Sequence, residues 1–87
     1  MEFLIEHLLK ELDDAETYAE KSAECDDMEC KSCYRQLASE ELSHFERLSA
    51  LYHKVHKKTA ATSAVDDMWV KYLKSRCEHI RSKINDI

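Results

Sequence analysis

Apolar residues recur with helical spacing in three segments of the chain, and short polar stretches separate these segments. Between residues 3 and 24 they form one wide face, and a second series runs from about residue 28 to about residue 58. A third series extends from about residue 64 to about residue 86 and contains Trp69. The pattern therefore predicts an all-α protein with three helices over these ranges, in a single domain of residues 1–87.

Polar residues at the two interruptions predict where the helices begin. Asp26, followed three residues later by Glu29, is typical of a capping box at the start of the second helix. The connection is so short that the first two helices are expected to form an antiparallel hairpin that turns at residues 25–28. Ser63 predicts the cap of the third helix. Whether that helix packs on its own hairpin or on another subunit stays open, with Trp69 as the expected anchor in either case.

Glu41 and His44 interrupt the longest apolar series of the chain near its middle. At heptad spacing they fall on one helical stripe with six other residues, namely Cys30, Tyr34, Leu37, Leu48, Leu51 and Val55. This placement predicts that both polar groups are buried on the inner face of the second helix. A buried ionised carboxylate is costly unless it is paired or binds a cation, so a metal ion is the expected partner.

A second carboxylate is expected on the first helix, facing Glu41 across the hairpin. Residues at equal distances from the turn lie opposite each other, and both Glu11 and Glu16 have the right height for this contact. The helical wheel slightly favours Glu16, because it lies nearer the centre of the apolar stripe. Di-iron carboxylate bundles use one Glu from each of two helices and a Glu-x-x-His from each of the other two. One hairpin supplies half of this set, so a two-fold homodimer would complete a four-helix bundle.

The spacing of these residues resembles that of ferritins and rubrerythrins. Glu11 is followed seven residues later by Tyr18, and a step of thirty residues leads from Glu11 to the motif Glu41-Leu-Ser-His44. The pattern is most similar to that of encapsulated ferritins, which are short chains with one half-motif that assemble an iron site between subunits. The resemblance implies that Glu11 rather than Glu16 joins Glu41 and His44 as a metal ligand. It also implies that Tyr18 lies beside the di-iron centre as a catalytic group.

The same resemblance implies a ferroxidase that oxidises Fe(II) to Fe(III) in iron oxidation, storage or detoxification. The carboxylate and imidazole ligands also suit manganese or zinc. The protein is expected to associate with itself, as a ferritin-like homodimer or a larger ring of dimers, because two half-sites must meet. Residues 82–87 contain no recognisable signal for a nanocompartment, so an encapsulin shell is not an expected partner.

Composition narrows the choice of partners. The chain of 87 residues contains no Gly and no Pro and has 36% charged residues, which favours long amphipathic helices. Its net charge of -5 argues against nucleic acid as the main partner, because phosphate binding requires clustered Lys and Arg. No signal peptide or membrane span is recognised, which predicts a cytoplasmic protein.

The remaining candidate ligands are cysteines and histidines. Cys25, Cys30 and Cys33, with Cys77 farther along, match a ferredoxin-type spacing, but their helical positions argue against an iron–sulfur cluster. A small structural zinc site that includes Cys77 is an alternative; otherwise the cysteines are expected to be small buried residues without disulfides. The histidines outside the motif lie off the main stripes or near helix ends and are assigned no role; these are His7, His53, His56 and His79.

A metal-free alternative uses the same two polar residues. Glu41 and His44 would then close a buried polar network that sets helix register, in a helical module that binds itself or a partner. The two hypotheses differ in whether the substitution Glu41→Ala removes a metal-dependent contribution to stability.

Overall fold

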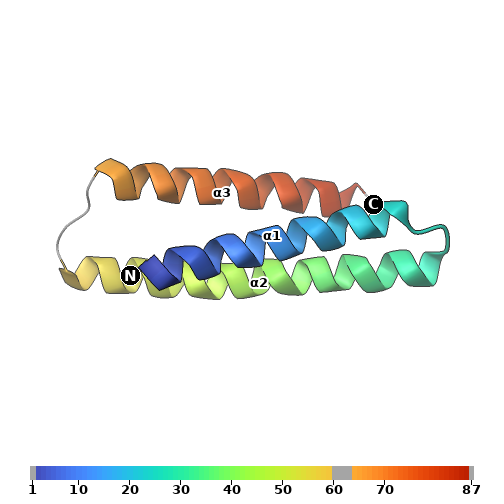
Figure 1. The fold of residues 1–87 in the computed structure, drawn as a ribbon, viewed down its shortest axis with the longest axis horizontal. Helices are drawn as coiled ribbons and strands as arrows, with labels where there is room; N and C mark the ends of the chain where they lie inside the picture. The colour runs from blue at the N-terminus through green and yellow to red at the C-terminus, as the bar shows by residue number, and fades with distance from the viewer. Residues whose placement is uncertain (1, 60–63, 87) are drawn as a thin grey trace.

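The computed structural model describes the backbone of residues 2–59 and 64–86, and the side chains of residues 3–55 and 68–86. It contains three helices: α1 spans Glu2–Glu24, α2 spans Met28–Thr59 and α3 spans Ala64–Asn85. Successive helices run antiparallel, and the molecule is a slender rod of 50 × 17 × 16 Å (Figure 1). The all-helical prediction is confirmed, and each observed helix end lies within one residue of the expected range.

α3 packs along the hairpin of its own chain, which answers the question that the sequence left open (Figure 1). Four residues at helical spacing bury one face of this helix; they are Leu73, Cys77, Ile80 and Ile84. Ion pairs connect α3 to both helices of the hairpin, since Arg76 pairs with Asp13 of α1 and Arg81 pairs with Glu46 of α2. Within one chain, the third helix therefore covers one side of the hairpin.

Trp69 lies at the edge of the contact between α3 and the hairpin, and its role as an anchor stays a prediction. Its side chain is 38% exposed, and the neighbouring Met68 and Tyr72 are 70% and 50% exposed. The rings of Trp69 and Tyr72 pack edge to face, with centroids 5.9 Å apart, and these residues line a shallow apolar groove with Leu9. The four buried residues farther along α3 supply its contact with the core. The expected cap Ser63 and the side chains of Val65, Asp66, Asp67 and Ile87 lie outside the described residues.

The core contains a different stripe of α2 from the one that heptad spacing selected. The buried residues of this helix are Ala38, Leu42, Phe45 and Tyr52. By contrast, Leu51 of the predicted stripe is 46% exposed. Heptad spacing aligns residues on a helix, but it does not determine which of two adjacent stripes the neighbouring helix covers. No helix in the described part of the chain is long and apolar enough to cross a membrane.

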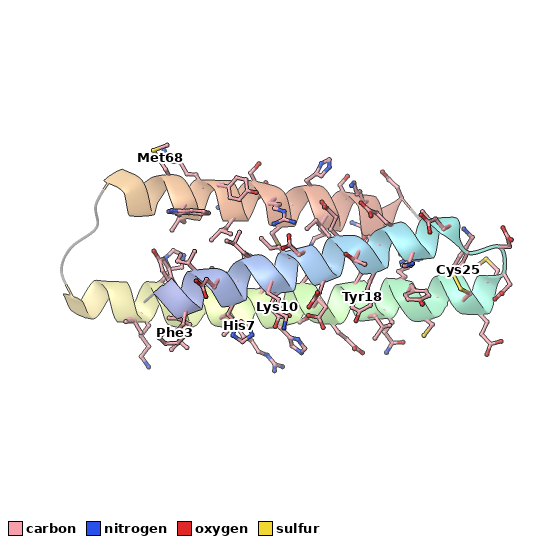
Figure 2. The ribbon with its side chains drawn as sticks, in the orientation of Figure 1. Phe3, His7, Lys10, Tyr18, Cys25 and Met68 are labelled. Carbon is pink, nitrogen blue, oxygen red and sulfur yellow. A yellow bond between two sulfur atoms is a disulfide. The ribbon has the colours of Figure 1, made fainter. Side chains whose placement is uncertain are left out.

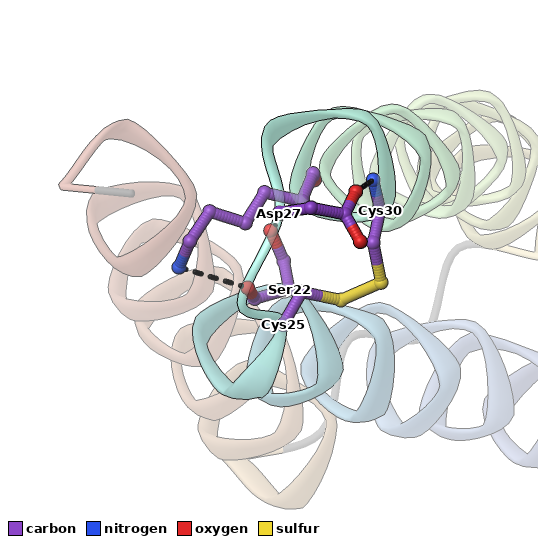
Figure 3. The surroundings of a disulfide bond; sticks show 5 residues. Ser22, Cys25, Asp27 and Cys30 are labelled. Atoms are coloured by element: carbon purple, nitrogen blue, oxygen red, sulfur yellow. Dashed lines mark hydrogen bonds between the residues drawn. A yellow bond between two sulfur atoms is a disulfide. The ribbon is translucent and has the colours of Figure 1, made fainter.

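Asp27, rather than Asp26, caps the start of α2. The side chain of Asp27 accepts a hydrogen bond of 2.7 Å from the backbone N–H of Cys30, three residues later, as expected of an N-cap (Figure 3). The turn is also held by Ser22, which is fully buried near the end of α1. Its hydroxyl donates a hydrogen bond of 2.8 Å to the backbone carbonyl of Lys31 on α2. The predicted cap is therefore displaced by one residue, from Asp26 to Asp27.

A disulfide joins Cys25 and Cys30 across the hairpin turn (Figure 3). Cys33 is a free and exposed thiol, whereas Cys77 is a free and buried thiol on α3. Burial raises the pKa of Cys77, which keeps this thiol neutral. The expectation of small buried cysteines without disulfides thus holds for Cys77 alone. The alternative zinc site was wrong, because two of its proposed ligands are bonded to each other.

Candidate metal centre

Three polar side chains meet on the surface of the α1–α2 hairpin. Glu11 comes from α1, and Glu41 and His44 come from adjacent turns of α2. One ligand atom of each residue lies within 4.8 Å of the other two. Nδ1 of His44 is 3.6 Å from Oε2 of Glu11 and 3.8 Å from Oε1 of Glu41. The hairpin thus brings together the three residues that the sequence nominated as ligands, and we call them the triad.

Glu16, the alternative carboxylate, lies on the other side of α1. Five residues turn a helix by about 140°, so Glu16 cannot share the direction of Glu11. The Oε1 atom of Glu16 is 3.8 Å from a guanidinium nitrogen of Arg76 on α3. This carboxylate therefore has a cation within its own chain and takes no part in the triad.

The triad lies at the margin of the core rather than inside it. The side chains of Glu11 and Glu41 are 12% and 20% exposed, but that of His44 is 51% exposed. The prediction that both polar residues of the α2 stripe are deeply buried was therefore wrong. The reason is the displaced stripe of α2, which leaves His44 facing outward while Leu42 and Phe45 contact the core.

The two carboxyl groups of the triad strongly influence each other. Hydrogen bonding to Glu11, together with burial and the charge of that carboxylate, raises the pKa of Glu41 from 4.5 to about 7. Burial favours the neutral form of Glu11 too, but hydrogen bonds from Glu41 and His7 and the charge of the imidazoles outweigh it, so the pKa of Glu11 is lowered. Without another cation the pair therefore retains a proton on Glu41 near neutral pH.

The geometry of the triad suits a metal ion better than it suits a set of hydrogen bonds. Oε2 of Glu11 is buried and accepts no hydrogen bond from an N–H or hydroxyl of the described residues, so within the triad only the acid proton of Glu41 is available to this carboxylate. The distances from His44 to the two carboxylates are too long for hydrogen bonds. Bonds of about 2.1 Å to one ion place two ligand atoms roughly 3 to 3.5 Å apart, so these side chains need only small movements to bind one. Two carboxylates and one imidazole are ligands that suit Fe(II), Mn(II) or Zn(II).

His7 also belongs to this region, although the sequence assigned it no role. Its Nε2 atom is 3.0 Å from Oε1 of Glu11, one helical turn away on α1. His7 thus contacts one oxygen of the carboxylate while His44 faces the other. The sequence did contain a signal for this contact: His7 and Glu11 are four residues apart, and this spacing places two side chains side by side on a helix.

Tyr18 lies on α1 seven residues beyond Glu11 and is half-buried. Its ring packs against Tyr34 of α2, with centroids 6.1 Å apart. Among the described residues, no hydrogen bond joins Tyr18 to the triad. Its catalytic role stays a prediction.

Helical spacing places several apolar residues on the same sides of α1 and α2 as the triad. We call this surface the open face; besides the triad it contains Phe3, Tyr18, Tyr34, Leu37, Leu48 and Leu51. Phe3 is 69% exposed, and Leu51 is 46% exposed. Figure 2 shows Phe3, His7 and Tyr18 extending from α1 away from α3, whereas Met68 lies on the outer side of α3. The open face therefore carries the triad together with two exposed apolar side chains, Phe3 and Leu51.

Comparison of the chain with protein-family models, with curated proteins and with solved structures finds no match. The resemblance to ferritins consequently rests on the residue spacing alone.

Proposed function

We propose that this protein is a ferritin-like ferroxidase whose iron site forms between two copies of the chain. The observation that carries the proposal is the convergence of Glu11, Glu41 and His44, with ligand atoms within 4.8 Å of one another. The half-motif predicted from the sequence is thus assembled by one hairpin. Oε2 of Glu11 is buried and accepts no hydrogen bond from an N–H or hydroxyl of the described residues, which supports a cation in place of the proton that Glu41 holds.

Dimerisation is proposed because one chain offers too few ligands for two iron ions. Its triad supplies two carboxylates and one imidazole, and a two-fold copy would double this set around the axis. The exposed position of His44 and the apolar residues of the open face make this surface suitable for a second copy. Four carboxylates brought together without metal would repel, so iron binding and dimerisation are expected to favour each other.

In this proposal iron is the substrate. Two Fe(II) ions each lose one electron, and molecular oxygen takes up both electrons and two protons to become hydrogen peroxide. The contribution of the protein is electrostatic, because the carboxylates of Glu11 and Glu41 stabilise Fe(III) more than Fe(II). The proton held by Glu41 in the metal-free protein must leave when an ion binds. Manganese or zinc would occupy the same ligands without supporting this oxidation in the same way.

The test is aerobic titration of the metal-free protein with Fe(II), following the absorbance of Fe(III) and the mass of the assembly. We expect saturation near two irons per dimer, with oxidation faster than in buffer. Glu41→Ala and His44→Ala should each abolish the accelerated oxidation. Glu40→Ala is the matched control, since Glu40 is an exposed carboxylate beside Glu41 that is 3.4 Å from the side chain of Gln36.

An association state indifferent to iron, with no iron bound, would refute the ferroxidase proposal. The metal-free helical module would then explain the open face as a surface for self-association. Equal loss of activity in Glu40→Ala would instead indicate a nonspecific effect of surface charge.

A further inference from the structure

We propose that His7 is a positioning residue that holds the Glu11 carboxylate so that one chosen oxygen faces the metal. This inference rests on the proposed function, because it concerns the same site. The structure carries it through the unequal surroundings of the two Glu11 oxygens. Oε1 contacts Nε2 of His7 at 3.0 Å, whereas Oε2 is buried and accepts no hydrogen bond from an N–H or hydroxyl of the described residues.

The chemistry of the contact determines which atom donates. An ionised carboxylate is only an acceptor, so Nε2 of His7 must hold the hydrogen and donate it to Oε1 of Glu11. Both residues lie on α1, four positions apart, so the hydrogen bond forms within one helix. It therefore does not depend on a second copy of the chain or on the exact packing of α2.

The hydrogen bond limits how Glu11 can present itself. The terminal torsion of a glutamate side chain is broad, so a free carboxylate rotates and offers either oxygen to an ion. With Oε1 held by His7, the plane of the carboxylate is set and Oε2 is directed toward Nδ1 of His44, 3.6 Å away. Glu11 is thereby prepared to bind through Oε2 alone.

His7 itself is not a member of the triad. The group whose ligand atoms lie within 4.8 Å of one another consists of Glu11, Glu41 and His44. The His7 side chain is 50% exposed, which places the imidazole on the solvent side of the carboxylate. A residue in this position acts through the ligand that it holds, and the loss of such a contact typically lowers metal affinity by about 10- to 100-fold.

The test compares His7→Leu, which removes the donor, with His7→Gln, which retains an N–H donor on a side chain of similar reach. Co(II) is the probe, because its visible absorption spectrum reports the geometry of the ligands. Affinity and spectrum are both measured, and helical circular dichroism checks that each variant is folded. His79→Leu is the matched control, since His79 is an exposed imidazole on α3, which contributes nothing to the triad.

We expect His7→Leu to weaken Co(II) binding by about 10- to 100-fold and to change the spectrum. We expect His7→Gln to restore most of the affinity and His79→Leu to behave like the unmodified protein. Wild-type affinity and spectrum in His7→Leu would overturn the positioning role alone. Equal losses in His7→Leu and His7→Gln would also overturn it, because the imidazole would then be a ligand. If the unmodified protein binds neither Co(II) nor Fe(II), the proposed function fails and the positioning role fails with it.

Discussion

Carboxylates on opposite sides of α1 have different partners. On the side of α3, Asp13 and Glu16 both pair with Arg76. On the side of the open face, Glu11 meets a second carboxylate, Glu41, and two imidazoles. The first group is neutralised by a permanent cation of the chain, because a guanidinium is charged at every physiological pH.

The difference shows which acidic group still needs a positive charge. The Arg76 guanidinium retains its proton, since the hydrogen bond to Asp13 and the charge of that carboxylate raise the pKa of Arg76 despite burial. The triad contains no comparable cation, and it compensates by holding a proton on Glu41. The carboxylates of α1 thus have two roles. Asp13 and Glu16 pair with α3, whereas Glu11, together with Glu41 of α2, is suited to an added cation.

The sharpest way to separate the two groups is to remove one carboxylate from each. Glu11→Ala should lower the affinity for Fe(II) or Co(II) by more than about 100-fold, because a ligand contributes more than a residue that merely holds a ligand. Glu16→Ala, on the α3 side, should leave the affinity unchanged. Metal titration of both variants checks this, and comparable losses would show that metal binds through diffuse negative charge.

Truncating an apolar side chain should also have different effects on the free energy of unfolding on the two sides of the hairpin. Ile80 is fully buried where α3 meets the hairpin, so Ile80→Ala should lower the free energy of unfolding by about 2 to 3 kcal/mol. Leu51 is 46% exposed on the open face, so Leu51→Ala should change the unfolding of a single chain by less than about 0.5 kcal/mol. Urea denaturation at low protein concentration measures both values.

The same pair of variants also tests self-association. Leu51→Ala should weaken the dimer in sedimentation measurements if the open face receives a second copy. A dimer of unchanged strength would place the contact elsewhere.

A change of pH should alter metal affinity and stability through the protonation of Glu41 on the open face. The pKa of Glu41 is about 7 in the folded chain, so protons compete with metal below that pH, and the apparent affinity should be about tenfold weaker at pH 6 than at pH 8. In the metal-free protein the folded state retains this proton longer than the unfolded state, whose pKa is near 4.5. The contribution of Glu41 to stability should therefore fall as the pH rises from about 4.5 to about 7.

Two titrations check these expectations, one of metal affinity and one of unfolding free energy against pH. Glu41→Gln is the control, because its neutral amide should remove the decline in stability attributed to this residue. A decline that persists in Glu41→Gln would assign it to another group.

The smallest expected effect concerns the ion pairs beside α3. Arg76→Ala should lower the free energy of unfolding by only about 1 kcal/mol, because Asp13 is 65% exposed and water screens most of the attraction. Part of this loss comes from the buried stem of the arginine. Metal affinity should not change. A large decrease in affinity would mean that the α3 side and the open face are energetically coupled.

Local features of the sequence determined the fold class and the helix boundaries. The period of the apolar residues and the absence of Gly and Pro were enough for three helices. The pairing of Glu11 with Glu41 followed from the antiparallel register and the family resemblance, whereas the helical wheel alone favoured Glu16. The cap at Asp27 was missed by one residue because two adjacent aspartates fit the same local pattern.

Only the tertiary structure decided which stripes were covered and which carboxylate received a cation. The stripe with His44 and the stripe with Phe45 are both apolar enough to be buried, and contact with α1 and α3 selects the second. Arg76 and Glu16 are sixty positions apart in the sequence, so no local sequence pattern could predict that this carboxylate pairs with α3. Periodicity determines the direction of a side chain on its own helix, but burial and charge compensation depend on which neighbour lies in that direction.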